Sequence, residues 1–162
     1  RITGRPSTGA PPSSASNNNS GIKPKPAARA ARSIGDEAYE ELYEMLYVAL
    51  LELSNEQQLV KLPMDLSKAR TKVWLSKVEL GPKFAFSALQ GTDKAAFGWE
   101  DLTVDDQAML AAVVARLRRE DPVAQAIAGI FMEAADNTVM ADQYFKQAGP
   151  ALAEKINSIF SK

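Results

Sequence analysis

The sequence predicts an α+β domain dominated by helices and preceded by a basic linker. Apolar residues recur at helical spacing near the start of the domain, alternate with polar residues in the centre, and return to helical spacing in the last third. Hydrophobic residues make up 46% of the chain, which is enough for a core. The expected order is an N-terminal amphipathic helix, a small antiparallel β-meander, and a C-terminal helical hairpin followed by a last helix.

Residues 1–33 are expected to form a disordered basic linker. They are rich in Ser, Asn, Pro, Gly and Ala and show no hydrophobic periodicity, so burial cannot offset the chain entropy. Residues 1–35 hold six of the 19 cations and none of the 20 acids, which makes this stretch +6 and the remainder −7. We therefore expect residues 34–162 to be one globular domain at the end of a larger protein.

The first helix is predicted over about residues 36–53, with Asp36 as its N-cap. Tyr39, Tyr43 and Tyr47 form a stripe at i, i+4 spacing on its apolar side. We interpret the stripe as core packing with hydroxyl groups at the rim; an aromatic face for a ligand is the alternative. Because Tyr47 lies at the edge of the stripe, it is the tyrosine expected to be most exposed.

The central meander is predicted at about residues 72–100, after an unassigned stretch that contains Pro63. Gly81-Pro82 and the turn at residues 90–93 divide it into two or three short strands. Such a small sheet must pack on the helices. Its large aromatic residues are therefore expected in the core, although exposed rings of this kind can also stack on bases. These residues are Trp74, Phe84, Phe86, Phe97 and Trp99.

Helix-start residues divide the last third of the chain. Thr103 and Asp106 resemble a capping box, and Asp121-Pro122 is an N-cap followed by proline at the first helical position. Further helices are expected over about residues 122–135 and 138–148. Gly149 should end the second of these, and Pro150 should open the last helix.

The hairpin over residues 122–149 resembles one tetratricopeptide repeat. Gly129 in its first helix and Ala141, Phe145 and Ala148 in its second match the family pattern, in which small residues allow close approach and the phenylalanine fills the groove. Gln125 and Met132 stand where the family usually has Trp and Tyr, and no second copy follows. A generic helical hairpin is the alternative. The resemblance implies protein–protein recognition without chemistry.

Composition removes most catalytic classes. The chain has no Cys and no His, which excludes thiolate chemistry and the commonest general base and zinc ligand. Glu37, Glu40, Glu41 and Glu44 lie opposite the apolar stripe, so they are expected to be solvated. No phosphate-binding glycine loop and no apolar run of membrane-spanning length occur. We expect no catalytic residue, no metal site and no cofactor.

The predicted function is a non-catalytic protein-interaction or structural module. The hairpin and the last helix are expected to provide the partner surface, and burial of the candidate side chains would remove this idea. Alternatives are polyanion or nucleic-acid contact through the basic tail, a carboxylate-based enzyme, and weak self-association through apolar helix faces. The candidate partner-binding residues are Met132, Met140, Gln143, Tyr144 and Tyr47.

Overall fold

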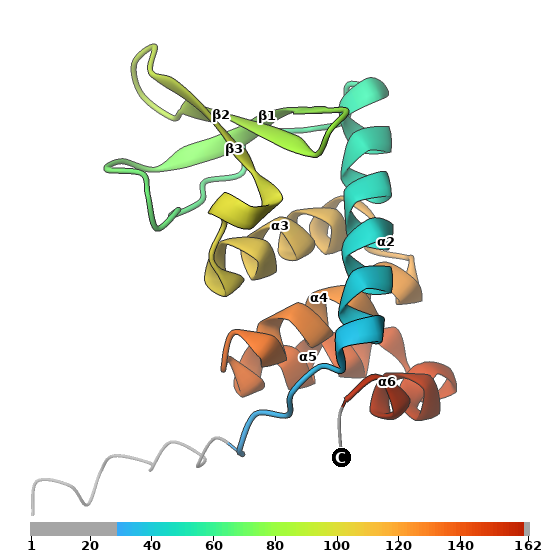
Figure 1. Ribbon diagram of the computed structural model, residues 1–162. Coiled ribbons are helices and arrows are strands. Elements are labelled where there is room, and N and C mark those ends of the chain that lie inside the picture. The colour runs from blue at the N-terminus through green and yellow to red at the C-terminus, as the bar shows by residue number, and fades with distance from the viewer. Residues whose placement is uncertain (1–28, 161–162) are drawn as a thin grey trace, which may run out of the picture.

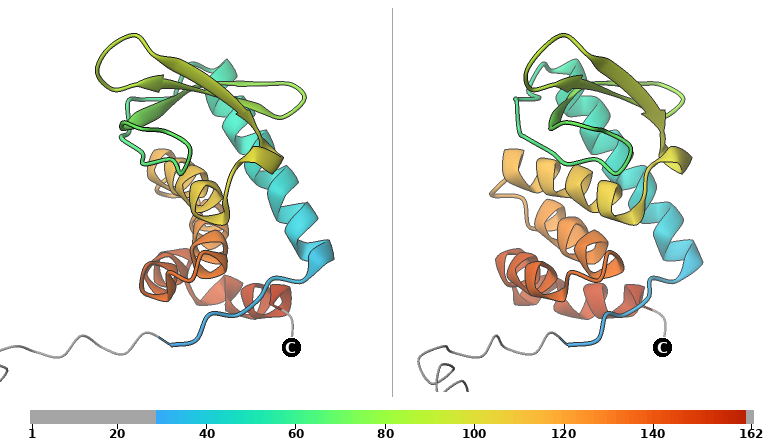
Figure 2. Two further views of the ribbon diagram at one scale, coloured as in Figure 1. Left: turned by 60° about the vertical axis from the view of Figure 1, so that its left-hand side comes forward. Right: turned by 90° about the vertical axis from the view of Figure 1, so that its left-hand side faces the viewer.

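The computed structural model describes residues 29–160 and contains helices and a three-stranded sheet in the predicted order. The sheet lies at one end, the helices of the last third are stacked below it, and the long helix α2 runs alongside the stack (Figures 1 and 2). The α+β, mainly helical class is therefore confirmed. The elements are α2 (Asp36–Asn55), β1 (Val73–Glu79), β2 (Lys83–Ala88), β3 (Lys94–Gly98), η2 (Trp99–Asp101), α3 (Val104–Leu117), α4 (Pro122–Ala134), α5 (Thr138–Ala148), η3 (Pro150–Leu152) and α6 (Ala153–Ile159).

Helix α2 packs on both the sheet and the stacked helices through a continuous leucine stripe. Leu42, Leu46, Leu50 and Leu53 are all at most 4% exposed, and their spacing of three or four residues keeps them on one face. The predicted N-cap is wrong by one residue. Gly35 has the extended backbone of the cap, whereas Asp36 is already helical, where its negative charge still suits the helix N-terminus.

The three strands form an antiparallel sheet in the order β1-β2-β3, which confirms the meander. Alternation buries Leu75 of β1 and both Phe84 and Phe86 of β2 on the face that meets the helices. The unassigned stretch before the sheet is a loop. It is tied to the sheet because Met64 forms an isolated bridge with Val73.

The predicted starts of α3 and α4 and the predicted end of α5 are confirmed, whereas Pro150 opens the short 3-10 helix η3 and α6 begins only at Ala153. Thr103 and Asp106 form the reciprocal capping box of α3, with the Asp106 amide donating to Thr103 Oγ1 at 3.2 Å. Asp121 caps α4 through the Val123 amide at 2.9 Å. Gly149 ends α5 with φ of +89°, a conformation that glycine adopts without strain.

The tyrosine stripe packs as core against the sheet, η2 and the helices α3 and α4. The indole Nε1 of Trp99 donates to the Tyr39 hydroxyl at 3.0 Å, and that hydroxyl donates to Gln107 at 2.9 Å. The ring of Tyr43 lies 4.4 Å from Trp99 between centroids. Hydroxyl groups at the edge of an aromatic core are thus confirmed. Because Trp99 is 8% exposed and Phe84 is fully buried, neither can stack on a base. The predicted burial of Trp74 is wrong: its ring is half-buried outside the core, beside Lys61.

Residues 29–35, which we call the strap, pack on the helices. The Gly35 amide donates to the Ile159 carbonyl at 3.1 Å, and Ile34 bridges Phe160. Both ends of the described chain therefore meet at the end of the molecule opposite the sheet (Figure 1). Arg29 and Arg32 of the strap bind side chains of the hairpin. The sequence placed residues 29–33 in the linker, but the folded part includes them.

Candidate interaction surface

A surface hollow between α3 and α5 brings together three of the predicted partner-binding residues. It has a volume of about 430 Å³. Met140, Gln143 and Tyr144 contribute to it from α5, where their spacing of one turn puts them on one face. The end of α3 supplies the opposite wall. The α3–α5 hollow is lined by Ala115, Arg116, Arg119, Gln125, Met140, Gln143, Tyr144 and Gln147.

The hollow carries positive charge that the domain does not neutralise. The side chains of Arg116 and Arg119 are exposed, and within residues 29–160 neither forms an ion pair or a hydrogen bond. The neighbouring Arg118 differs, because it binds Glu52 of α2 at 2.9 Å. The sequence explained these arginines only as favourable charges at a helix C-terminus. Their position beside α5 depends on how α3 and α5 pack on α4, so no local pattern reveals it.

Two polar groups complete the lining. Gln125 is 2% exposed and donates through Nε2 to the Ala115 carbonyl at 2.9 Å, which fixes its amide below the hollow. Burial raises the pKa of the Tyr144 hydroxyl, although Arg116 acts in the opposite direction. Tyr144 is therefore protonated at neutral pH and can donate a hydrogen bond. Guanidinium and phenol donors next to Met140 suit a ligand with both a carboxylate and apolar atoms.

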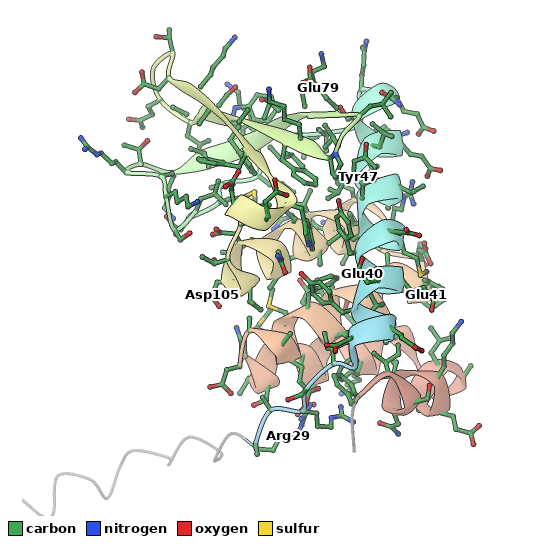
Figure 3. The ribbon with its side chains drawn as sticks, viewed as in Figure 1. Arg29, Glu40, Glu41, Tyr47, Glu79 and Asp105 are labelled. Atoms are coloured by element: carbon green, nitrogen blue, oxygen red, sulfur yellow. The ribbon has the colours of Figure 1, made fainter. Side chains whose placement is uncertain are left out.

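Two of the predicted residues lie elsewhere. Met132 of α4 is 7% exposed in the core, so its side chain is not available to a partner. Tyr47 lies on α2 near the sheet (Figure 3), where its hydroxyl donates to the Glu79 carbonyl at 3.1 Å and its ring packs edge-on against Phe84. Both positions have a structural explanation: residues 124–133 of α4 are all buried, and Tyr47 is at the end of α2 that meets the sheet.

The contact between α4 and α5 has the geometry that the small residues predict. A Cβ atom on Gly129 would come within 2.5 Å of Phe145 Cε1 and 3.2 Å of the Ala141 carbonyl oxygen. The close approach at Gly129 and the phenylalanine in the groove are therefore confirmed. Because such a crossing also occurs in generic hairpins, the tetratricopeptide resemblance stays a prediction.

Glu133 is the one fully buried acid on α4, and sequence reasoning missed it. Its carboxylate accepts hydrogen bonds from Arg29 and Arg32 of the strap, both at 2.9 Å, as well as from the Arg32 amide at 3.0 Å. The Arg32 guanidinium also lies 4.1 Å from the Phe160 ring centroid. Burial alone would raise the pKa of Glu133, but the hydrogen bonds from both arginines lower it to about 2.

The carboxylates considered for chemistry are exposed to solvent on one helix. Glu37, Glu40, Glu41 and Glu44 are exposed on α2, and Figure 3 shows Glu40 and Glu41 extending from this helix. Across residues 29–160 no three acidic side chains are grouped so that they could hold a metal ion. The same residues include no helix with the length and hydrophobicity needed to cross a bilayer.

Comparisons with known proteins found no relative, so a functional proposal rests on the structure. The chain matches no family model, no curated protein and no solved structure.

Proposed function

We propose that this domain is a non-catalytic protein-interaction module that binds an acidic segment of a partner protein in the α3–α5 hollow. The observation that carries the proposal is the meeting of Arg116 and Arg119, whose charges no described residue neutralises, with Met140 and Tyr144 of the hairpin. A carboxylate of the partner would accept hydrogen bonds from the guanidinium groups and the phenol, while an adjoining apolar side chain would contact Met140.

Charge complementarity favours an acidic segment over other partners. Arg116 and Arg119 have no ion-pair partner among the described residues, so they attract an anion. A single carboxylate can accept hydrogen bonds from both of them. The competing idea, polyanion contact through the basic tail, loses support because Arg29 and Arg32 are bound to Glu133. The remaining four cations of that tail lie outside the described residues.

The proposal is tested by selecting peptides from a random library displayed against the full chain. We expect the selected peptides to be acidic, and the best of them to bind the R116E/R119E variant at least roughly tenfold more weakly by fluorescence anisotropy. Replacing Tyr144 by Phe should weaken binding by a smaller factor, because the ring stays and only the hydroxyl is lost.

The matched control is the K83E/K94E variant, which makes the same change of charge at two exposed lysines of the sheet. It should bind the selected peptide within about twofold of the wild type, since lost long-range attraction is screened at physiological salt. Equal weakening in both variants would mean that only net charge matters. Selection of peptides without acidic residues would likewise contradict the proposal.

A further inference from the structure

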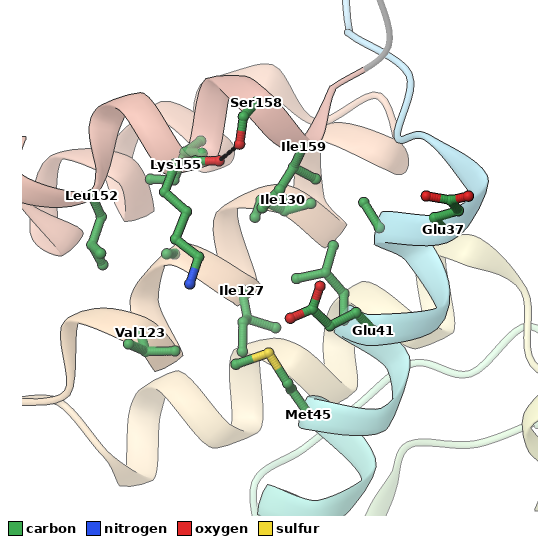
Figure 4. Close-up of a pocket in the computed structure, with 14 residues that line it drawn as sticks. Glu37, Glu41, Met45, Val123, Ile127, Ile130, Leu152, Lys155, Ser158 and Ile159 are labelled. Carbon is green, nitrogen blue, oxygen red and sulfur yellow. Dashed lines mark hydrogen bonds between the residues drawn. The ribbon is translucent and has the colours of Figure 1, made fainter.

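A second hollow lies between α2, α4 and α6, away from the α3–α5 hollow, and it differs in chemistry. Its volume is about 340 Å³, within the range of about 300–1,000 Å³ usual for binding sites. Ile127 and Ile130 of α4 form its floor (Figure 4). Met45 and Val123 at its margin are 38% and 40% exposed, so part of the apolar lining faces solvent.

The two walls of this groove carry opposite charges. Glu37 and Glu41 line it from α2, and Lys155 lines it from α6. Figure 4 shows the Glu41 carboxylate and the Lys155 amine both directed toward the space between these helices. Among residues 29–160 none of these three side chains has an ion-pair partner, and all three are exposed. The exposed apolar margin of the groove is therefore bordered by one acidic and one basic wall.

We propose that this α2–α4–α6 groove binds an amphipathic helix of a partner protein, with basic residues along one edge of that helix and acidic residues along the other. Two apolar side chains one turn apart would enter the groove and contact Met45 and Val123, the exposed apolar residues of its margin. The basic edge would lie beside Glu37 and Glu41, and the acidic edge beside Lys155.

The walls favour a helix over an extended peptide. The floor and both walls are helices, whose backbone donors and acceptors are bonded internally, so the groove has no strand edge to which an extended chain could add. A helix brings its own backbone hydrogen bonds. A second copy of this chain is also a poor occupant through this surface, because two facing hollows would leave a void between them.

The test uses three synthetic helical peptides of about four turns, roughly 14 residues. Each carries leucines one turn apart, and the edges are Lys and Glu in the first, Lys on both sides in the second, and Glu on both sides in the third. Binding to the full chain is followed by backbone amide shifts in NMR titrations. We expect the mixed peptide to bind most tightly and to shift the groove residues.

Variants then reverse the preference or remove the contact. K155E makes both walls acidic, so it should prefer the peptide with two Lys edges. M45D should weaken the mixed peptide by at least roughly tenfold, because it removes an apolar contact from the groove. V48D is the matched control: Val48 is 49% exposed on the same helix but does not line the groove, so its effect should stay within about twofold.

Several results would overturn the proposal. These are equal binding of all three peptides, equal effects of M45D and V48D, absence of shifts in the groove, or self-association that shifts the groove residues without peptide. The R116E/R119E variant should keep its affinity for the mixed peptide, since its substitutions lie in the other hollow. The proposal therefore stands or fails separately from the acidic-segment function.

Discussion

Glu133 shows how one side chain can tie distant parts of this chain together. It is fully buried, yet it is ionised, because Arg29 and Arg32 of the strap supply hydrogen bonds that offset the loss of water. Arg29 also binds Asp142 at 2.7 Å, which extends the contact to α5. A buried carboxylate that lost these partners would be costly, so we expect the stability of the hairpin to depend on the strap.

The first prediction concerns acid stability. The pKa of Glu133 is about 2 in the folded state against an ordinary value of 4.5, so its contribution to stability is complete above pH 4.5 and is lost as pH falls toward 2. We expect E133Q to lower the free energy of unfolding at pH 7 by about 3 kcal/mol. Its stability should also depend less on pH between 4.5 and 2 than that of the wild type.

Urea unfolding followed by circular dichroism at several pH values measures both effects. Asp106 provides the control, since hydrogen bonds from Ser67 and Thr103 also outweigh its burial and lower its pKa. The E133Q variant should therefore keep that part of the acid dependence. An unchanged pH profile in E133Q would show that the strap arginines do not hold the carboxylate ionised.

At the scale of elements, local residues set the limits of helices and strands, and contacts between elements set their positions. The capping residues Thr103 and Asp121 mark helix starts in the sequence and in the structure alike. The N-cap of α2 is Gly35 and not the predicted Asp36, because the strap reaches the helix in an extended conformation and the Gly35 amide is hydrogen-bonded to the Ile159 carbonyl. A pattern of local residues could not show that contact.

The second prediction tests the α4–α5 crossing. Alanine is a better helix former than glycine by about 1 kcal/mol. If Gly129 were exposed, its replacement by alanine would therefore stabilise the protein. Its Cβ would instead meet the Phe145 ring at 2.5 Å. We expect G129A to be destabilised by about 1–3 kcal/mol. Adding F145L should restore part of the loss, and thermal unfolding of both single variants and the double variant measures the coupling; additive effects would contradict the contact.

At the scale of the whole molecule, the two ends of the described chain contact each other. The strap passes between the ends of α4 and α6, where Arg32 contacts Glu133, Asn157 and Phe160. The sheet is at the other end of the molecule, and α2 joins the two (Figure 1). Loss of the strap should therefore weaken the helical end without changing the hydrogen bonds of the sheet.

The third prediction compares two truncated chains, residues 29–162 and residues 34–162. They differ only in residues 29–33, so any difference in stability belongs to that segment. We expect the shorter chain to be less stable by about 3–5 kcal/mol, because Glu133 is left buried without its arginines. Hydrogen exchange should increase most in α4 and α6. Equal unfolding midpoints would show that residues 29–33 are only a linker.

The sequence alone determined the class of the fold, the order of its elements and most helix boundaries, because periodicity and capping act between residues a few positions apart. It also pointed to Met140, Gln143 and Tyr144, which face outward on one helix. Only the tertiary structure decided which charges meet. Arg32 and Glu133 are 101 positions apart, and Arg116 and Arg119, at and just after the end of α3, reach the hairpin through packing on α4. Such pairs leave no periodic signal, since their distance depends on the whole arrangement of helices.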